Sequence, residues 1–235
     1  INVSRRRDGE SVSFLVPVTY AQDLLRRVAE QAAPPEDFNP LIAKQLLAHQ
    51  GGMVDRLLEE PLTLKGMGPY LVPVRESGQV RCWGRSNARG AAYAVDAMSC
   101  VMQSAVFVSD VQQTGNVSMT HRYIRSGTMD PMRFAALATD IFQVDNLGST
   151  GDPRLTKPFC TERFVHTRTL PLRAVTCVRA YRKFEGLYNF TLLTASTDAS
   201  QASLQSRLDV SGVSYENGMR VTRAYLGAFG RPVRK

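Results

Sequence analysis

CVRAYRKFEGLYNFTLLTAS, residues 177–196, is the stretch that decides the fold. It contains two runs rich in β-branched and aromatic residues, 178–184 and 187–195, with a short turn between them. Such residues pack well on a pleated surface, and two runs joined by a short turn are typical of a β-hairpin. We therefore predict two antiparallel strands here, in a part of the chain that is mainly β.

Further strands are predicted before this hairpin, at residues 70–74, 101–108 and 118–125, because these stretches have a similar composition. One helix interrupts the strands. Asp130 is expected to cap it and Pro131 to be its first residue, where the missing N–H of proline costs nothing. The region is therefore α+β, with strands predominating.

The C-terminal part begins with a polar stretch, residues 197–207, in which we predict no strand. Ser214 then caps a closing helix, whose apolar stripe fits core packing and requires no ligand. The stripe consists of Tyr215, Met219, Thr222, Leu226 and Phe229. We predict that residues 40–235 form a mainly antiparallel β domain with flanking helices.

Four cysteines occur as two pairs of similar separation, each pair enclosing a predicted long loop. They are Cys82 and Cys100, then Cys160 and Cys177. An even count with matched separations favours two local disulfides, although four cysteines permit three connectivities. Disulfides persist in oxidising compartments, so we expect a periplasmic or secreted protein. Four reduced thiols in a cytosolic protein is the alternative.

The composition excludes several classes of protein. Of the 235 residues 43% are hydrophobic and 21% are charged, as in a globular protein with a core. No apolar run approaches the roughly 18 residues of a membrane span, so we predict none. The net charge is +8, and only five of the 29 basic residues are Lys. Because the Arg residues are scattered and no RNA-binding signature accompanies them, we expect a solvated surface rather than nucleic-acid binding.

No catalytic motif is complete within these 235 residues. A Gly-rich phosphate loop, a paired-His zinc motif, a calcium loop and a G-x-S-x-G elbow are all missing from the sequence. His121 and His166 lie in predicted strands and are interpreted as packing or surface histidines. Since no C-x-x-C occurs and no His has zinc-site spacing to the cysteines, we expect no metal and no cofactor.

A proline-rich linker, residues 34–39, precedes the β domain. Asn39 is expected to cap the next helix, with Pro40 at its first position. Gly51 and Gly52 are predicted to end that helix, and a short helical piece follows at residues 53–60.

The N-terminal residues predict a hairpin followed by a helix. Asp8 and Gly9 form a turn dipeptide, and residues 12–18 are typical of an apolar strand. Thr19 with Gln22 three residues later makes a capping box, which predicts that a helix begins there.

This N-terminal segment resembles the last part of a trypsin-like serine protease domain of the bacterial, high-temperature-requirement type. In that family the nucleophile's G-x-S-G-G-P is followed by a strand reading roughly G-I-N, a turn, a strand reading roughly F-A-I-P, and a closing helix. Ile1-Asn2 match the end of G-I-N, and residues 14–17 (FLVP) match F-A-I-P. The resemblance covers residues 1–30, with Leu24 and Leu25 in the closing helix.

The resemblance implies a substrate-binding role for five residues. The first strand would pair with the substrate backbone, and the second would help to wall the primary specificity pocket. These residues are Val3, Ser4, Arg5, Ser13 and Phe14. The catalytic His, Asp and Ser would all lie before Ile1, so we expect a processed chain or a fragment that is inactive alone.

The resulting hypothesis is the C-terminal portion of an exported trypsin-like serine endopeptidase. Residues 1–33 would be the end of the protease domain, the last hairpin and helix of its β-barrel. Residues 40–235 would be a disulfide-bonded accessory domain that positions substrates or regulates access. Its partners would be a polypeptide substrate or the upstream protease segment. The alternative is a non-enzymatic periplasmic or secreted binding or scaffold module.

Overall fold

The computed structural model describes residues 2–5, 13–15, 17–30, 35–77, 80–87, 92–102, 106–109, 112–144, 152–167, 169–199 and 201–232. The chain divides into two compact units, Ile1–Phe38 and Asn39–Lys235, which are described separately. No described helix is both long enough and apolar enough to cross a membrane.

The first unit contains a hairpin and a helix, in the predicted order. Strand β1 (Asn2–Arg5) pairs antiparallel with β2 (Ser13–Leu15), and α1 (Val18–Ala29) follows. The predicted cap at Thr19 is wrong. Pro17 occupies the N-cap position with extended backbone, and because proline favours the start of a helix, α1 already includes Val18.

The second unit is built on one seven-stranded sheet. Its order is β10-β11-β12-β13-β9-β6-β5, and every neighbouring pair is antiparallel. The strands are β5 (Val80–Asn87), β6 (Tyr93–Met102), β9 (Asn116–Ser126), β10 (Phe159–His166), β11 (Pro171–Ala180), β12 (Tyr188–Ser196) and β13 (Ala202–Val213). Two separate hairpins are β3 (Thr63–Met67) with β4 (Tyr70–Val74), and β7 (Val106–Ser109) with β8 (Gln112–Thr114). The prediction of an α+β fold with mainly antiparallel sheets is confirmed, whereas the trypsin-like origin of the first unit stays a prediction.

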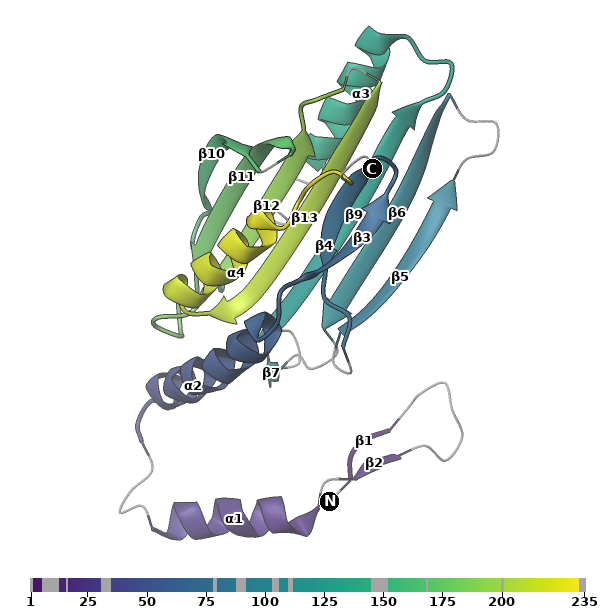
Figure 1. Cartoon of the computed structure of the whole chain (residues 1–235). Coiled ribbons are helices and arrows are strands. Elements are labelled where there is room, and N and C mark those ends of the chain that lie inside the picture. The colour runs from purple at the N-terminus through teal and green to yellow at the C-terminus, as the bar shows by residue number, and fades with distance from the viewer. Residues whose placement is uncertain are drawn as a thin grey trace. The chain divides into compact units, whose positions relative to one another are not determined.

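Helices cover the two faces of the sheet unequally. Helix α4 (Tyr215–Gly227) lies across one face, over β12 and β13 (Figure 1). Helix α3 (Pro131–Val144) lies on the opposite face, because Gln205 of β13 points away from α4 and donates from Nε2 to the Ala138 carbonyl at 2.6 Å. Helix α2 (Asn39–Leu58) contacts both β13 and α4.

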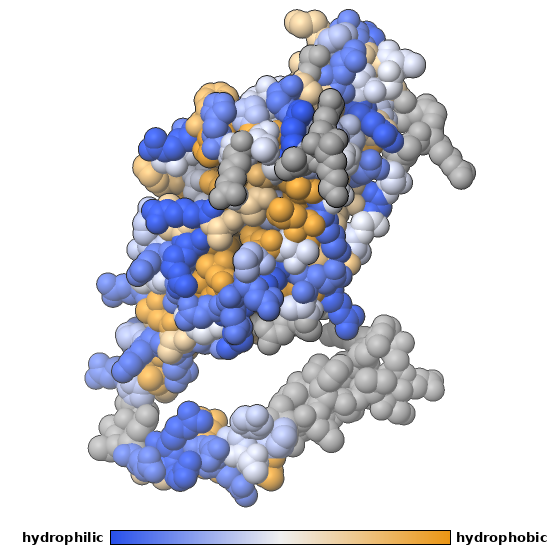
Figure 2. All heavy atoms as spheres, in the orientation of Figure 1, coloured by the Kyte–Doolittle hydropathy of each residue, from blue (hydrophilic) through white to orange (hydrophobic). Residues whose placement is uncertain are grey.

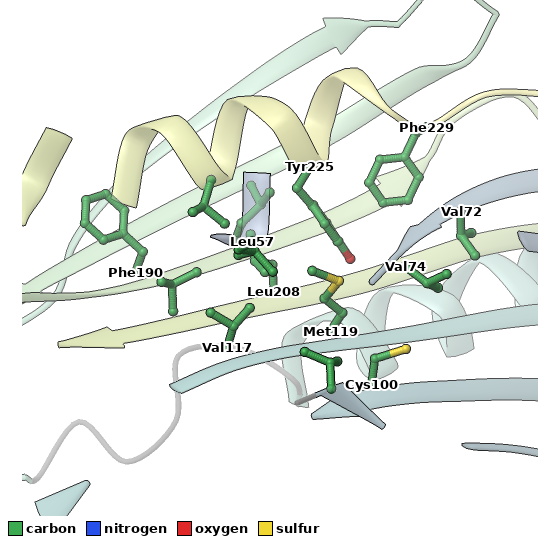
Figure 3. Packing of buried hydrophobic residues seen from close by; sticks show 14 of the residues in the cluster. Leu57, Val72, Val74, Cys100, Val117, Met119, Phe190, Leu208, Tyr225 and Phe229 are labelled. Carbon is green, nitrogen blue, oxygen red and sulfur yellow. The ribbon is translucent and has the colours of Figure 1, made fainter. Parts of the chain in front are cut away.

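The main core lies between the sheet and the layer formed by α4 and the β3–β4 hairpin. Tyr225 and Phe229 point from this layer toward Met119 of β9 and Leu208 of β13 (Figure 3). Val72 and Val74 of β4 complete the cluster on the far side of Phe229. Because all these side chains are buried, the position of α4 is fixed by the core.

Two of the three helix caps predicted in this unit are confirmed, whereas α2 already includes Asn39, its predicted cap, as its first residue. Asp130 Oδ1 accepts hydrogen bonds from the backbone N–H groups of Met132 and Arg133 at the start of α3. Ser214 Oγ accepts from the N–H of Asn217 at 3.2 Å at the start of α4. These side chains satisfy donors that a helix N-terminus leaves without partners.

The prediction that Gly51 and Gly52 end a helix is wrong, because α2 continues without interruption to Leu58. Residues on both sides of the two glycines, such as Leu46 and Val54, are buried in core clusters. Burial of this face outweighs the cost of glycine in a helix interior, about 1 kcal/mol per residue.

The strand predictions are correct for some segments and wrong for others. Most residues between the paired cysteines, predicted as long loops, belong to strands β5, β6, β10 and β11. The polar stretch 197–207 contains the first half of β13, a central strand. Residues 101–108 divide between β6 and β7, and residues 178–184 leave β11 after Ala180.

At each edge of the sheet, one disulfide joins the edge strand to its inner neighbour. Cys82–Cys100 links β5 to β6, and Cys160–Cys177 links β10 to β11. In both cases the two cysteines are directly opposite each other in the strand register. The predicted local pairing is confirmed, and disulfides are compatible with an extracytoplasmic location.

Gly218 allows α4 to approach β12 closely. A Cβ at this position would lie 2.1 Å from the ring of buried Phe190, whereas a Cβ at Gly227 on the same helix would meet nothing within 4 Å. We predict that Gly218→Ala lowers the free energy of unfolding by about 1–3 kcal/mol through overpacking. Gly227→Ala is the matched control and should change it by less than about 1 kcal/mol. Urea denaturation measures both, and equal effects would contradict this account of the contact.

The disulfide at β10 is predicted to hold an otherwise weakly covered strand in the sheet. Replacing Cys160 and Cys177 by Ala should remove about 3 kcal/mol of stability, since the bridge closes a 17-residue separation. Hydrogen exchange followed by mass spectrometry should show faster exchange in β10 and unchanged exchange in β5. The corresponding variant at the other edge, with Cys82 and Cys100 replaced by Ala, should show faster exchange in β5 and unchanged exchange in β10. Unaltered protection of β10 in the first variant would refute the prediction.

Candidate functional site

A hollow of about 510 Å³ lies between α4 and strands β10, β11 and β12 of the second unit. We call it the α4 groove. It is lined by Phe159, Thr161, Arg163 and Val165 of β10, Ala174, Thr176, Val178 and Ala180 of β11, Tyr188 of β12, Tyr215, Met219, Thr222, Arg223 and Leu226 of α4, and Thr156 and Lys157. Its volume is in the range of protein ligand sites.

The groove exists because α4 covers only part of the sheet face. The helix packs over β12 and β13, so most groove-facing residues of β10 stay exposed and those of β11 are only partly covered, although Leu172 and Ala174 of β11 are buried. Every second residue of these two strands lines the groove, as the alternation of side chains in a strand requires. Figure 2 shows hydrophobic residues gathered in the middle of this side of the molecule and hydrophilic residues around them.

Strand β10 forms the outer wall of the groove. It pairs with β11 over eight residues without a register shift, and no other described strand pairs with it. Phe159 is 73% exposed, and Phe164 on the other face of the strand is 70% exposed. The outer edge of β10 therefore presents main-chain donors and acceptors to a further strand.

The two faces of β10 differ in charge. On the face away from the groove, Arg173 Nε donates to Glu162 Oε1 at 2.6 Å, and this hydrogen bond holds the pKa of Glu162 below its usual value. The groove face carries Arg163, and the described residues of the groove lining include three cations and no carboxylate. The groove is thus apolar and uniformly positive.

The substrate-binding residues that the protease resemblance implies lie in the first unit. The β1–β2 register places Ser4 opposite Phe14 and Arg5 opposite Ser13, and Val3 lies between Asn2 and Ser4 on β1. The hairpin has the expected pairing. Its role in substrate binding stays a prediction.

The sequence predicts no binding surface in the second unit, and nothing in it was interpreted as the groove. Its residues come from three separate segments, which the sheet and α4 bring together. One signal was present: residues 159–165 alternate Phe, Thr, Arg and Val with Cys, Glu and Phe, which is typical of a two-faced strand. The interpretation of this segment as a loop concealed that pattern.

A serine and a histidine are adjacent in the core, but they do not form a reactive pair. His121 Nε2 donates to the Pro73 carbonyl at 2.8 Å, so in the neutral ring Nδ1 accepts from Ser206 Oγ, also at 2.8 Å. His121 is fully buried and stacks on Tyr225 of α4 at 5.9 Å. Since the helix excludes substrate, this pair stabilises the core, as the interpretation of His121 as a packing histidine anticipated.

Burial of His121 should make the fold sensitive to acid. Burial lowers the pKa of His121 to about 4 from an ordinary value of 6.5, and the hydrogen bond to Pro73 opposes this only in part. The unfolded state therefore binds more protons between pH 6.5 and 4. We predict that the stability contribution is complete above pH 6.5 and is lost as the pH falls to 4, by about 3 kcal/mol.

Urea unfolding across this pH range would measure the effect. His121→Gln should remove the corresponding part of the pH dependence, whereas His166→Gln, at an exposed position of β10, should retain it. An NMR titration of the wild-type imidazole provides a check that needs no variant. Protonation of His121 near pH 6.5 in the folded protein would contradict the prediction.

No known protein family matches the sequence, and no curated protein matches it. Among solved structures, the chain is similar to LpqN of Mycobacterium tuberculosis, which is described as involved in cell envelope biogenesis. The two share 12% sequence identity over 76% of this chain and 96% of LpqN, with a TM-score of 0.35. This likeness is too weak to support a conclusion about fold or function.

Proposed function

We propose that the second unit is a periplasmic or secreted domain that binds an extended segment of another polypeptide in the α4 groove. One observation carries the proposal: the groove is bordered by β10, a regular edge strand of eight residues whose outer side is unpaired in the described part of the chain. An extended peptide can add to such an edge through main-chain hydrogen bonds.

The side chains around β10 suit this mode of binding. A strand added to β10 would place every second side chain on the α4 side of the sheet, next to Thr161 and Arg163. Exposed Phe159 and the half-exposed Tyr215 offer aromatic contacts at low cost in conformational entropy. Main-chain pairing would then supply affinity, and the groove would supply selectivity.

We further propose that this domain serves a trypsin-like serine endopeptidase by positioning its polypeptide substrate, with residues 1–30 as the end of the protease domain. The β1–β2 hairpin followed by α1 supports this part of the proposal. So does the apolar stripe of α1, because none of its residues is buried and such a stripe is stable in water only when another surface covers it. Val18, Tyr20, Leu24, Leu25 and Val28 form that stripe.

A stand-alone binding module would use the same groove without a protease. The protease hypothesis and the binding-module hypothesis differ in what residues 1–30 pack against. A G-x-S-G-G motif encoded shortly before Ile1 would favour the protease, and its absence there would leave the binding module.

Binding of an unfolded polypeptide tests the proposal directly. Reduced and alkylated lactalbumin should bind the whole chain in a fluorescence anisotropy titration. Thr176→Trp, on the groove floor, should weaken binding by about tenfold or more by filling the site. Val175→Trp is the matched control, because the adjacent residue of β11 faces the other side of the sheet and should leave the affinity unchanged.

Failure of lactalbumin to bind the wild-type chain would overturn the proposed function, as would equal effects of the two tryptophan variants. The same mixture tests the protease assignment. We expect no cleavage of lactalbumin by residues 1–235 alone, since the catalytic triad would lie upstream. Cleavage that a serine-directed inhibitor blocks would contradict that assignment.

A further inference from the structure

Three cations line the α4 groove, and none has an ion-pair or hydrogen-bond partner among the residues that the structure describes. They are Lys157 just before β10, Arg163 on β10 and Arg223 on α4. Among the described residues, no Asp or Glu lines the groove to neutralise them. The groove therefore has three positive charges available to a ligand.

Three arginines outside the groove are neutralised. Arg220 lies three residues before Arg223 on α4, and its Nη1 donates to Asp55 Oδ1 at 3.0 Å. Arg173 on β11 pairs with Glu162, and Arg207 on β13 pairs with Asp209. Carboxylates therefore neutralise these three arginines outside the groove, whereas no described carboxylate pairs with Arg163 or Arg223 inside it.

The position of these charges determines what they can attract. Lys157 and Arg163 stand on the sheet side of the groove, and Arg223 stands on the helix side. Between them lie apolar side chains, including Val178, Met219 and Leu226. A carboxylate held next to apolar surface interacts more strongly with a cation than one in open water, and Arg guanidinium groups can bind it with two hydrogen bonds.

We infer that the α4 groove selects polypeptide segments in which carboxylate side chains alternate with apolar residues. The inference rests on the proposed function and names the class of segment that the groove takes. In an extended segment added to β10, the carboxylate side chains lie on the α4 side of the sheet, where they reach Arg163 and Arg223, and the apolar side chains lie on the opposite side, next to exposed Phe164. Lys157 adds a third positive charge near the start of β10.

The groove fits a polypeptide better than a lipid with an anionic head group. Its sheet side ends at the open edge of β10, and its floor includes Thr161 and Thr176, whose hydroxyl groups suit main-chain and polar partners. An acyl chain gains nothing from an unpaired strand edge or from hydroxyl groups. Laurate is therefore the competing ligand in the test.

The experiment compares two fluorescent octapeptides, which match the length of β10, in titrations against the whole chain. One alternates Leu with Glu, and the other alternates Leu with Gln. We expect the Glu peptide to bind about tenfold more tightly than the Gln peptide at low salt, the size of one charge-assisted contact. Added sodium chloride should reduce this preference, because it screens exposed charges.

Variants then assign the preference to individual residues. Arg163→Gln and Arg223→Gln should each bring the affinity for the Glu peptide close to that for the Gln peptide. Arg220→Gln is the matched control, because it removes one positive charge from the same helix outside the groove. It should leave the preference unchanged.

The outcomes separate this inference from the proposed function. Equal affinity for the two peptides, or an equal loss in Arg220→Gln and Arg223→Gln, would overturn the inference while peptide binding itself stood. Absence of binding by both peptides and by unfolded lactalbumin would overturn the proposed function. Saturable binding of laurate that requires Arg163 and Arg223, without peptide binding, would assign the groove to an anionic amphiphile and overturn both.

Discussion

The pairing of β13 with β9 is the contact on which the rest of the second unit depends. Each of the two outer groups, β10 to β12 and β5 to β6, is built from neighbouring strands in the chain, but β9 and β13 come from distant segments. His121 and Ser206, which hydrogen-bond across this pair, are 85 residues apart. Closing so long a loop costs entropy that only many contacts offset, and ten residue pairs form between the two strands. This pairing turns two small sheets into one broad face on which α4 can pack.

The α4 groove follows from the width of that face. A single helix covers only part of a seven-stranded sheet, and Gly218 and the Ser214 cap hold α4 over the central strands. The sheet face of β10 and part of that of β11 then stay open beside the helix. An open apolar face and an unpaired edge are usually liabilities, since they favour aggregation. Here the cations of the groove and the disulfide at β10 limit that risk while the edge stays accessible.

Local chemistry made part of the fold predictable from the sequence. The caps at Asp130 and Ser214 and the strand at Tyr70–Val74 depend on a few adjacent residues, and the sequence predicts them correctly. Strand β13 could not be predicted in this way, because its polar residues on one face conceal a buried apolar face that only β9 and β12 create. The lining of the groove could not be predicted for the same reason. Arg163 and Arg223 belong to one site only because the fold places β10 and α4 beside each other on the sheet.

The net charge of +8 has a different meaning once the partners of individual arginines are known. Composition alone predicts a uniformly solvated basic surface. Outside the groove, however, Arg173, Arg207 and Arg220 are matched with carboxylates, so their charges contribute little to the field outside the protein. The unmatched charges of Arg163 and Arg223 stand beside apolar surface, where a positive potential is screened less by water and draws anionic groups toward one site. Selectivity for acidic segments would thus depend on where carboxylates are missing rather than on the total number of arginines.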